Sequence, residues 1–455
     1  MYKGKNCLVS EQPAGERGER VIVPLDFLPA HPLTRSLTQV PMVAAYLHAL
    51  RGSQRNVRLL LSISAIAGFT VDGGIYSVIF NLYLLRLNFG PAFVGQVNAV
   101  ANLVFAFGSI LGGWLGSRYG ERRTMILGMV IVVAGACGVP LTGTAPEAWR
   151  ASWVMASFVL LYFGLALYFA NSGPFLIRSM HVAARGDIFA MQSALNAMAS
   201  FAGGLLGGLL PALAAGLLGA TLASPAPYRI PLVVVGVLMF LAMALLLQTR
   251  TATAEPAEAA AAQAGAPTMT AAYGLITFMA VVRFLQLGGM GAAMTFFNVY
   301  MDTELGASTA TIGLIAASAR LLAVPAVLLG PALGRRIGYG TTAALTAGAA
   351  FLSSLPLALA GSVAGAGVGY VGLLASFSMR YPAFYVYLMG RTPDRLRAMM
   401  TGVNEMAAGL SVAFISLAGG YIIVQYGYAA TFLIGGAMTL AGALALYGYV
   451  RVKGE

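Results

Sequence analysis

Long apolar stretches recur along this chain from about residue 58 to residue 450, and they constrain its fold more than any other feature. A helix that crosses a bilayer needs about 20 mostly apolar residues. Hydrophobic residues make up 59% of the 455 residues and charged residues only 9%, which excludes a large soluble core. We therefore predict an all-α polytopic membrane protein, embedded in the lipid bilayer, with about twelve transmembrane helices. The predicted spans are 58–85, 92–116, 124–142, 152–177, 188–217, 230–248, 271–299, 310–333, 341–360, 366–389, 398–424 and 429–450.

Basic residues are distributed unevenly between the connections of these spans. The predicted cytoplasmic segments hold Arg51, Arg55, Arg58, Arg118, Arg122, Arg123, Arg178, Arg185, Arg250, Arg335, Arg336, Arg391, Arg395, Arg397, Arg451 and Lys453. The opposite side holds only Arg86, Arg150 and Arg229. Because Lys and Arg gather on the cytoplasmic side of membrane proteins, we expect a multi-pass protein of the inner membrane with both termini in the cytoplasm. The formal charge of +12 then reflects topology, and we expect no nucleic-acid partner.

Three segments lie outside the predicted spans and their short connections. Residues 1–56 carry scattered charge and several prolines but lack the apolar core of a signal peptide, so we expect a disordered cytoplasmic tail. Met42 offers an alternative translation start. An Ala-rich cytoplasmic linker is expected at 249–270, and a short cytoplasmic tail at 451–455.

An internal repeat relates the two halves of the chain. Phe80, Asn81 and Tyr83 at the end of the first span return as Phe297, Asn298 and Tyr300 at the end of the seventh. Further pairs link Gly95 to Gly313, Asn102 to Arg320, Pro174 to Pro382 and Asn196 to Asn404. Such repeats indicate two bundles related by an axis along the membrane normal. We predict that the two six-helix bundles comprise residues 57–248 and 271–450.

The segment that follows the second span carries a recognisable motif. It runs Gly-Trp-Leu-Gly-Ser-Arg-Tyr-Gly-Glu-Arg-Arg from residue 113 to residue 123. This segment resembles the cytoplasmic signature loop of the major facilitator superfamily (MFS), and with the repeat and the span count the resemblance covers residues 50–455. It implies the two-bundle fold of that family and a charge network that holds the cytoplasmic gate closed in the outward-facing state.

The resemblance assigns roles to individual residues of this loop. It implies tight helix packing at Gly113 and a turn at Gly120. It further implies gate contacts for Arg118, Arg122 and Arg123. Alternatively, these arginines serve only as anchors on the positively charged side of the membrane.

The loop also departs from the family pattern. Ser117 stands where the pattern has an aspartate, so the acidic half of the gate either comes from elsewhere or is weaker here. Glu121 and Asp187 are the candidates. The copy of the motif in the second half keeps Arg336 and Gly338 but contains no acid.

Five ionisable residues fall inside predicted spans: Asp72, Arg283, Arg320, Arg380 and Glu405. A charge near the bilayer centre costs roughly 2.5 to 3.5 kcal/mol on an insertion scale, so each residue needs water, a counter-charge or a ligand. The resemblance places all five on helices that surround the central cavity of the family fold.

Amide side chains on these helices extend the polar surface. Gln192 and Asn196 are four residues apart and share one face of the fifth span. The substrate and ion pathway that we predict comprises Asp72, Asn102, Asn171, Gln192, Asn196, Arg283, Arg320, Arg380, Asn404 and Glu405.

Proton coupling would require an acid, because arginine stays protonated in proteins. Asp72 has no arginine on its own helix face and is the first candidate for the proton site, and Glu405 is the second. Two structural alternatives stay open. Asp72 would then be a hydrogen-bonded core acid, and Arg380 and Glu405 would form a structural ion pair between neighbouring helices.

The three arginines within spans of the second half favour an anionic or zwitterionic organic solute, and the aromatic content of the lining would also accept amphipathic compounds. We predict a monomeric secondary active transporter that works by alternating access and is coupled to protons. A multidrug-type efflux protein, or a non-transporting sensor or scaffold with the same fold, is the alternative.

Enzymatic function is not expected. The chain contains no HExxH or GxSxG motif, and none of its three histidines falls within a predicted span. Gly367, Gly369 and Gly372 spell GxGxxG inside an apolar span with no preceding strand, so close helix packing explains them better than a dinucleotide site. We expect no cofactor and no metal.

Overall fold

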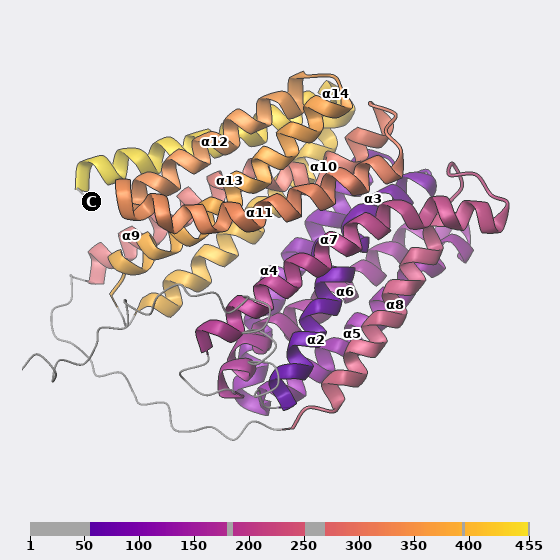
Figure 1. Cartoon of the computed structure of the whole chain (residues 1–455), viewed down its shortest axis with the longest axis horizontal. Helices are drawn as coiled ribbons and strands as arrows, with labels where there is room; N and C mark the ends of the chain where they lie inside the picture. Colours follow the sequence, from indigo (N-terminus) through magenta and orange to yellow (C-terminus); the bar gives the residue numbers. More distant parts are fainter. Residues whose placement is uncertain (1–54, 180–184, 251–268, 394–395, 454–455) are drawn as a thin grey trace, which may run out of the picture. The chain divides into compact units, whose positions relative to one another are not determined.

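The regular secondary structure is entirely helical in the part of the chain that the computed structural model describes (Figure 1). The described residues are 55–179, 185–250, 269–393 and 396–453. The predicted tail and linker therefore lie almost wholly outside the described residues. The account below concerns the unit that begins at Gly52.

Among the described residues, seven α-helices and one short 3-10 helix form the first half. They are α2 (Arg55–Thr70), α3 (Ile75–Arg86), α4 (Pro91–Tyr119), α5 (Glu121–Leu141), η3 (Thr142–Thr144), α6 (Glu147–Arg178), α7 (Arg185–Leu218) and α8 (Ala226–Leu247). The second half comprises α9 (Met269–Gln286), α10 (Gly288–Thr303), α11 (Thr309–Ile337), α12 (Tyr339–Leu359), α13 (Val363–Arg391) and α14 (Arg397–Lys453).

Twelve membrane crossings follow from these helices. Ten helical segments in the described residues are long and apolar enough to span a bilayer, and α2 with α3 and α9 with α10 each count as one. The final segment runs from Met399 to Val452, and Gly427, with φ 81° and ψ 174°, divides it into two crossings. Helix α13, 29 residues long, supplies the remaining crossing. The prediction of about twelve spans is confirmed.

Helix ends follow local sequence signals. Pro91 occupies the first turn of α4, where its missing N–H costs nothing. The hydroxyls of Ser308 and Ser362 cap α11 and α13 by accepting backbone N–H groups at 3.1 and 3.2 Å. Gly120 and Gly338 have φ of 94° and 90° and end α4 and α11 at equivalent points of the two halves. Because only glycine adopts such angles freely, the turn predicted at Gly120 is confirmed.

The crossings have two distinct ends. On one side, which we call the basic side, Arg122 at the start of α5 contacts the end of α8 at Thr249, and Asn56 exchanges two hydrogen bonds with the backbone of Arg250. On the other, which we call the far side, Arg86 at the end of α3 meets Asp302 at the end of α10.

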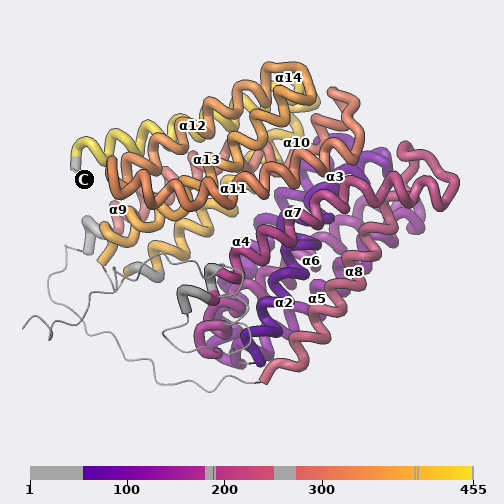
Figure 2. Tube along the Cα trace, viewed as in Figure 1, coloured from indigo at the N-terminus to yellow at the C-terminus, as the bar shows by residue number. Residues whose placement is uncertain are grey.

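Helices of the same half pack against one another in matching pairs. Helices α5 and α6 pack together in the first half as α12 and α13 do in the second, and Figure 2 shows each half as a group of neighbouring helices. Close approach depends on glycine in both pairs. A Cβ at Gly135 would lie 2.5 Å from the backbone N of Leu161, and one at Gly369 would lie 2.5 Å from that of Leu357. The packing role expected for the GxGxxG segment is thus observed at Gly369.

Two helix seams join the halves. In one, α4 packs on α14, with Gly95 against the backbone of Ser416. In the other, α7 packs on α11, where Gly208 and Gly313 approach backbone to backbone. Among the described residues, the polar contacts between the halves lie in the middle and toward the far side: Asn81 to Thr295, Asn298 to Ser77, Arg86 to Asp302, Gln96 to Tyr421 and Tyr228 to Thr309.

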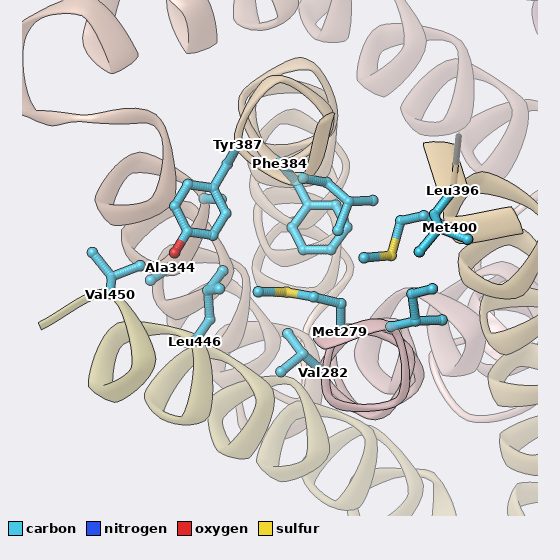
Figure 3. Packing of buried hydrophobic residues seen from close by; sticks show 12 residues of the cluster. Met279, Val282, Ala344, Phe384, Tyr387, Leu396, Met400, Leu446 and Val450 are labelled. Carbon is cyan, nitrogen blue, oxygen red and sulfur yellow. The ribbon is translucent and has the colours of Figure 1, made fainter. Parts of the chain in front are cut away.

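The second half contains an apolar core formed by α9, α12, α13 and α14. Figure 3 shows Phe384 and Tyr387 of α13 facing Met279 of α9, with Met400 beside them and Leu446 below. Because lipid tails are as apolar as these side chains, close van der Waals packing rather than the hydrophobic effect holds this core together. This core fixes α13, and with it the arginine that precedes Phe384 by one turn.

Candidate functional site

The first crossing is interrupted at mid-membrane. Helix α2 ends at Thr70, and Gly73, with φ 86°, allows the chain to step before α3 begins at Ile75. A Cβ at Gly74 or at Gly203 of α7 would collide with the carbonyl of Phe69, so both glycines are required for this step.

Asp72 lies on the step and faces α7. Its carboxylate accepts a hydrogen bond from Asn196 Nδ2 at 3.3 Å, and the Ser200 hydroxyl donates to its carbonyl at 2.6 Å. Asn196 of the predicted polar face and Ser200, one turn further along α7, therefore both meet Asp72. Gln192, one turn from Asn196, makes no hydrogen bond to the residues the structure describes. Asp72 itself is exposed and has no ion-pair partner among the described residues.

Arg320 reaches the same step from the other half. Its guanidinium lies so close to Gly73 that a Cβ there would be 2.6 Å from Arg320 Cζ. Within the described part of the chain, Arg320 has neither a hydrogen bond nor an ion pair. Its guanidinium lines a cavity. A cation without a partner at this depth is expected to attract an anion, since an unpaired charge is costly away from bulk water.

The cavity has a volume of about 210 Å³ and lies between the two halves. Its polar lining is dominated by amides, and its remaining wall is largely aromatic. The lining includes Asn81, Asn98, Asn102, Asn298, Ser77, Thr295, Tyr76, Phe80, Phe158, Tyr162 and Tyr370. Asn98 donates to Asn81 Oδ1 at 3.0 Å, and Asn102 donates to the carbonyl of Asn98 at 2.8 Å. Such a cavity can hold a small molecule that offers hydrogen-bonding groups, an apolar face and a negative charge.

A second charged cluster lies within the second half. Arg283 of α9 pairs with Glu405 of α14 at 3.6 Å, and the Tyr385 hydroxyl hydrogen-bonds to the same carboxylate. Arg380 of α13 is only 1% exposed and donates from Nη1 to Gln286 Oε1 at 2.6 Å. The cluster therefore holds two buried guanidinium groups and a single carboxylate.

Aromatic rings complete the surroundings of both arginines. Arg283 lies 5.7 Å from the ring centre of Tyr381, and Arg380 lies 5.1 Å from that of Phe377, while Phe384 is within 6 Å of both. These faces stabilise cations by their quadrupole but supply no negative charge. Nε of each arginine is buried without a hydrogen-bond partner in the described residues. The cluster keeps a net positive charge, whereas buried charges are normally balanced.

The pairing within this cluster differs from the structural alternative raised by the sequence. Glu405 is the ion-pair partner of Arg283, and Arg380 is bound by Gln286 instead. Because α13 and α14 follow one another in the chain, the sequence favoured an ion pair between Arg380 and Glu405. In the structure, α14 is rotated so that Glu405 reaches Arg283 of α9.

Two residues of the predicted pathway have a packing role in this conformation. Asn171 is buried between α4 and α6, where its Nδ2 donates to the carbonyls of Gly112 and Leu167. Asn404 is fully buried and donates to the carbonyl of Met400, one turn earlier in its own helix. Neither lines the cavity.

Comparison with known proteins adds the decisive observation. A family model described as Major Facilitator Superfamily matches residues 61–381 and, in a second match, residues 279–455. This chain belongs to the major facilitator superfamily. No curated protein matches the chain at a significant level.

Solved structures of superfamily members share the fold. The inward open conformation of the xylose transporter XylE from E. coli is 14% identical, with 87% of this chain and 95% of that chain covered and a TM-score of 0.66. A peptide transporter POT in complex with sulfate is 12% identical, covers 90% and 98%, and has a TM-score of 0.70. The nucleoside transporter NupG is 14% identical, covers 86% and 99%, and has a TM-score of 0.64.

The superfamily assignment gives the general nature of the protein. The chain is a multi-pass membrane protein of a transporter family, with a lipid environment and small-molecule substrates, rather than an enzyme. At identities this low the solved structures establish the fold alone.

The superfamily signature loop has a clear local structure here. Arg122 donates to the carbonyls of Leu247 and Thr249 at the end of α8, where a cation stabilises the helix terminus. Arg118 lies over the rings of Trp114 and Tyr119. The described contacts of Arg118 and Arg122 in the signature loop are thus with residues of the first half.

The packing role implied for Gly113 requires correction. No atom lies within 4 Å of a Cβ placed at Gly113, because this residue faces away from α6. Gly112 and Gly116, which lie on the opposite face, approach α6 at Leu167 and Asn171.

An acid is present in the loop despite the serine at position 117. Glu121 pairs with Arg178 of α6 at 3.5 Å, and Ser117 donates to the carbonyl of Trp114. The side chain of Asp187, the other candidate, lies outside what the structure describes. Arg123 and Arg336 are exposed. The gate contacts implied for these arginines remain a prediction for the other conformation.

Sequence reasoning missed several residues that the structure brings together. Arg86 was counted only among the basic residues of the side opposite the cytoplasm, and Asp302 was not singled out. Gln286 was not considered because an amide in an apolar span gives little signal. Asn81 and Asn298 were noticed only as members of the repeat. Their recurrence at equivalent helix positions was nevertheless the signal that could have marked them.

Proposed function

We propose that this protein is a secondary active transporter for a small organic anion or zwitterion and that it works by alternating access. The single observation that carries the substrate class is Arg320, a guanidinium on the wall of a polar cavity between the halves that has no partner in the described part of the chain. The Arg283 and Arg380 cluster supports the same class, because it has one positive charge more than Glu405 balances. The aromatic wall would hold the organic part of the solute.

Alternating access is supported by where the halves touch. The glycine seams and the Arg86 to Asp302 ion pair join the bundles toward the far side. The gate motifs near Gly120 and Gly338 lie at the basic side, and Arg122 and Glu121 there contact their own half. This arrangement corresponds to a state closed at the far side, from which the bundles would rock about the cavity.

Proton coupling is proposed to use Asp72, with Glu405 as the second candidate. Asp72 is exposed on the interrupted first crossing and has hydrogen bonds but no cation partner among the described residues. Glu405, in contrast, is held by Arg283. An acid without a counter-ion can take up a proton without first breaking an ion pair.

We further propose that the basic side faces the cytoplasm of a cell with an inner membrane and that both termini lie there. The concentration of arginine at that side supports this orientation. The functional unit is proposed to be a monomer, with bundles at residues 57–248 and 271–450.

A reconstituted transport assay tests the proposal. Purified protein in liposomes should accumulate a labelled organic acid when the side that holds the solute is made acidic, and it should exchange the acid without a gradient. Uptake of cationic solutes but of no acid would contradict the anion assignment. Uptake of acids that ignores an imposed pH gradient would contradict the proton coupling.

A further inference from the structure

The repeated asparagines make reciprocal contacts between the halves. Asn81 of α3 donates from Nδ2 to the carbonyl of Thr295 in α10 at 2.8 Å. Asn298 of α10 donates from Nδ2 to the carbonyl of Ser77 in α3 at 2.6 Å, and its distance to the carbonyl of Val78 is 3.4 Å. Thr295 precedes Asn298 by the same three residues by which Val78 precedes Asn81. Each half therefore contributes one asparagine donor, and one backbone carbonyl acceptor about a turn earlier in the same helix, to the contact with the other half.

Both asparagines also belong to the wall of the cavity. They are buried, and Asn81 Oδ1 accepts the hydrogen bond from Asn98. Asn298 Oδ1 has no hydrogen-bond partner among the residues that the structure describes. The groups that join the halves are thus within reach of a solute bound in the cavity.

This dual position has an energetic consequence. A buried amide donor that loses its acceptor without replacement pays its full desolvation cost, so the two bonds resist separation of α3 and α10. The two acceptor carbonyls lose little when these bonds break, because each belongs to a helix and can accept a backbone hydrogen bond with its other lone pair. A solute that offers oxygen acceptors to both amides would remove this resistance.

We propose that the substrate is a hydroxylated carboxylate, such as a hydroxy acid or a sugar acid, and that Asn81 and Asn298 bind its hydroxyl groups. The inference rests on the proposed anion transport: Arg320 takes the carboxylate, while the amides take hydroxyl oxygens. Binding exchanges the two cross-half bonds for bonds to the solute, and the far side is then free to open. The asparagines are specificity-determining residues and at the same time the latch of the far side.

Matched probes test the specificity. D-gluconate and n-hexanoate are both six-carbon monocarboxylates, but only gluconate carries hydroxyl groups. Binding to the purified protein, measured by calorimetry, should favour gluconate at least tenfold. In Asn81→Leu or Asn298→Leu, the preference for gluconate over hexanoate should fall about two- to tenfold per lost bond. Retained hexanoate binding also shows that each variant is folded.

A distance measurement tests the latch without any ligand. Spin labels at Glu147 and Glu304, which are exposed at the far side of the two halves, report its opening. The double variant Asn81→Leu, Asn298→Leu should increase the far-side-open population by about four- to 100-fold in the empty protein. Gluconate, but not hexanoate, should produce the same shift in the protein with both asparagines.

The outcomes separate this inference from the proposed function. Equal affinity for gluconate and hexanoate would leave an anion transporter but overturn the hydroxylated substrate. An unchanged distance distribution in the double variant would overturn the latch, whatever the substrate. Failure of both carboxylates to bind would contradict the anion class and the hydroxylated substrate together, and the distances would still decide the latch.

Discussion

The first and second halves of this chain share a scaffold but differ in their charges. Gly120 and Gly338 make the same turn, and Asn81 and Asn298 make reciprocal bonds. The arginines within the crossings of the second half have no such counterparts, and Arg320, for example, stands where the first half has Asn102. Repeated residues thus maintain the geometry of helices that must move together, while unrepeated residues supply the chemistry of the site.

Even an identical pair can differ in use. Asn196 bonds to Asp72, whereas its counterpart Asn404 is buried within its own bundle. The first crossing is interrupted by a step that carries an acid, and the equivalent seventh crossing continues almost directly from α9 to α10 through Leu287. We infer that the first half provides the proton site and the second half the anion site.

The largest effect should follow removal of the unrepeated arginine of the cavity. Arg320→Ala is expected to reduce uptake of an organic acid about 100-fold, because a hydrogen-bonded charge contributes up to about 3 kcal/mol. Arg150→Ala is the matched control, since Arg150 lies at the far side, does not line the cavity and donates from Nε to the nearby carbonyl of Ala145. Initial uptake rates in liposomes give the measurement.

Exchange of the repeat partners would sharpen this result. Asn102→Arg combined with Arg320→Asn places the guanidinium on the first half but still on the cavity wall. Partial recovery of uptake would mean that transport requires a positive charge on the cavity wall but not specifically at position 320. Normal uptake by Arg320→Ala alone would refute the division of roles between the halves.

The next effect concerns the acid of the first half. Asp72→Asn preserves volume and hydrogen-bonding capacity but fixes the neutral state, so accumulation driven by a pH gradient should disappear. Each pH unit can drive at most about tenfold accumulation per proton, which sets the expected loss. Counterflow exchange, which requires no net proton movement, should survive.

Comparison of two variants identifies the acid. Glu405→Gln should retain gradient-driven accumulation if Asp72 carries the proton. Loss of accumulation in Glu405→Gln and not in Asp72→Asn would transfer the coupling role to the second half. If Asp72→Asn lost accumulation and counterflow exchange together, and also gave a lower folding yield, Asp72 would be a structural acid.

A smaller effect is expected on stability in the second half. Arg283→Ala leaves Glu405 without its cation, whereas Arg380→Ala leaves only the neutral Gln286 without a donor. Removing one member of a fully buried pair costs about 3 to 5 kcal/mol, but Glu405 is 50% exposed, so about 1 to 2 kcal/mol is expected here. Thermal unfolding in detergent measures this loss.

The second-site change provides the control. Glu405→Ala should restore much of the stability of Arg283→Ala and little of that of Arg380→Ala. The reverse pattern would mean that Glu405 pairs with Arg380 in the membrane.

The fold was predictable because its determinants are local in sequence. Apolar length sets the crossings, and the turn at Gly120 follows from a glycine between two spans. That Asp72, Arg320 and Arg380 fall within crossings was predictable for the same reason. Pairing was not, because it depends on how each helix is rotated in its bundle. Glu405 meets Arg283 rather than Arg380 for that reason.

Residues at helix ends were the hardest to interpret. Arg86 and Asp302 end their crossings and therefore resemble solvated loop charges. Only the tertiary approach of α3 to α10 brings them together. Gln286 was hidden by its neutrality, although it is the hydrogen-bond partner of the most deeply buried arginine.

The smallest effect should come from this ion pair between the halves. Arg86 binds Asp302 through two hydrogen bonds of 2.6 and 2.8 Å, and its Nε also donates to the carbonyl of Leu222 within its own half. Asp302→Asn therefore weakens the cross-half contact while leaving the Leu222 bond intact. The side chains are 20% and 11% exposed, so the contact should contribute about 1 kcal/mol.

A change of that size would increase the far-side-open population about fivefold, as reported by the labels at Glu147 and Glu304. The charge exchange Arg86→Asp with Asp302→Arg should recover part of the closed population, because the attraction is restored while the Leu222 bond is lost. Leucine at Asn81 and Asn298 should open the far side further than Asp302→Asn, because the double variant loses two buried bonds between the halves, whereas Asp302→Asn only weakens one partly exposed contact. If Asp302→Asn opened the far side more than the double asparagine variant, the ion pair and not the repeated amides would be the principal contact holding the halves together.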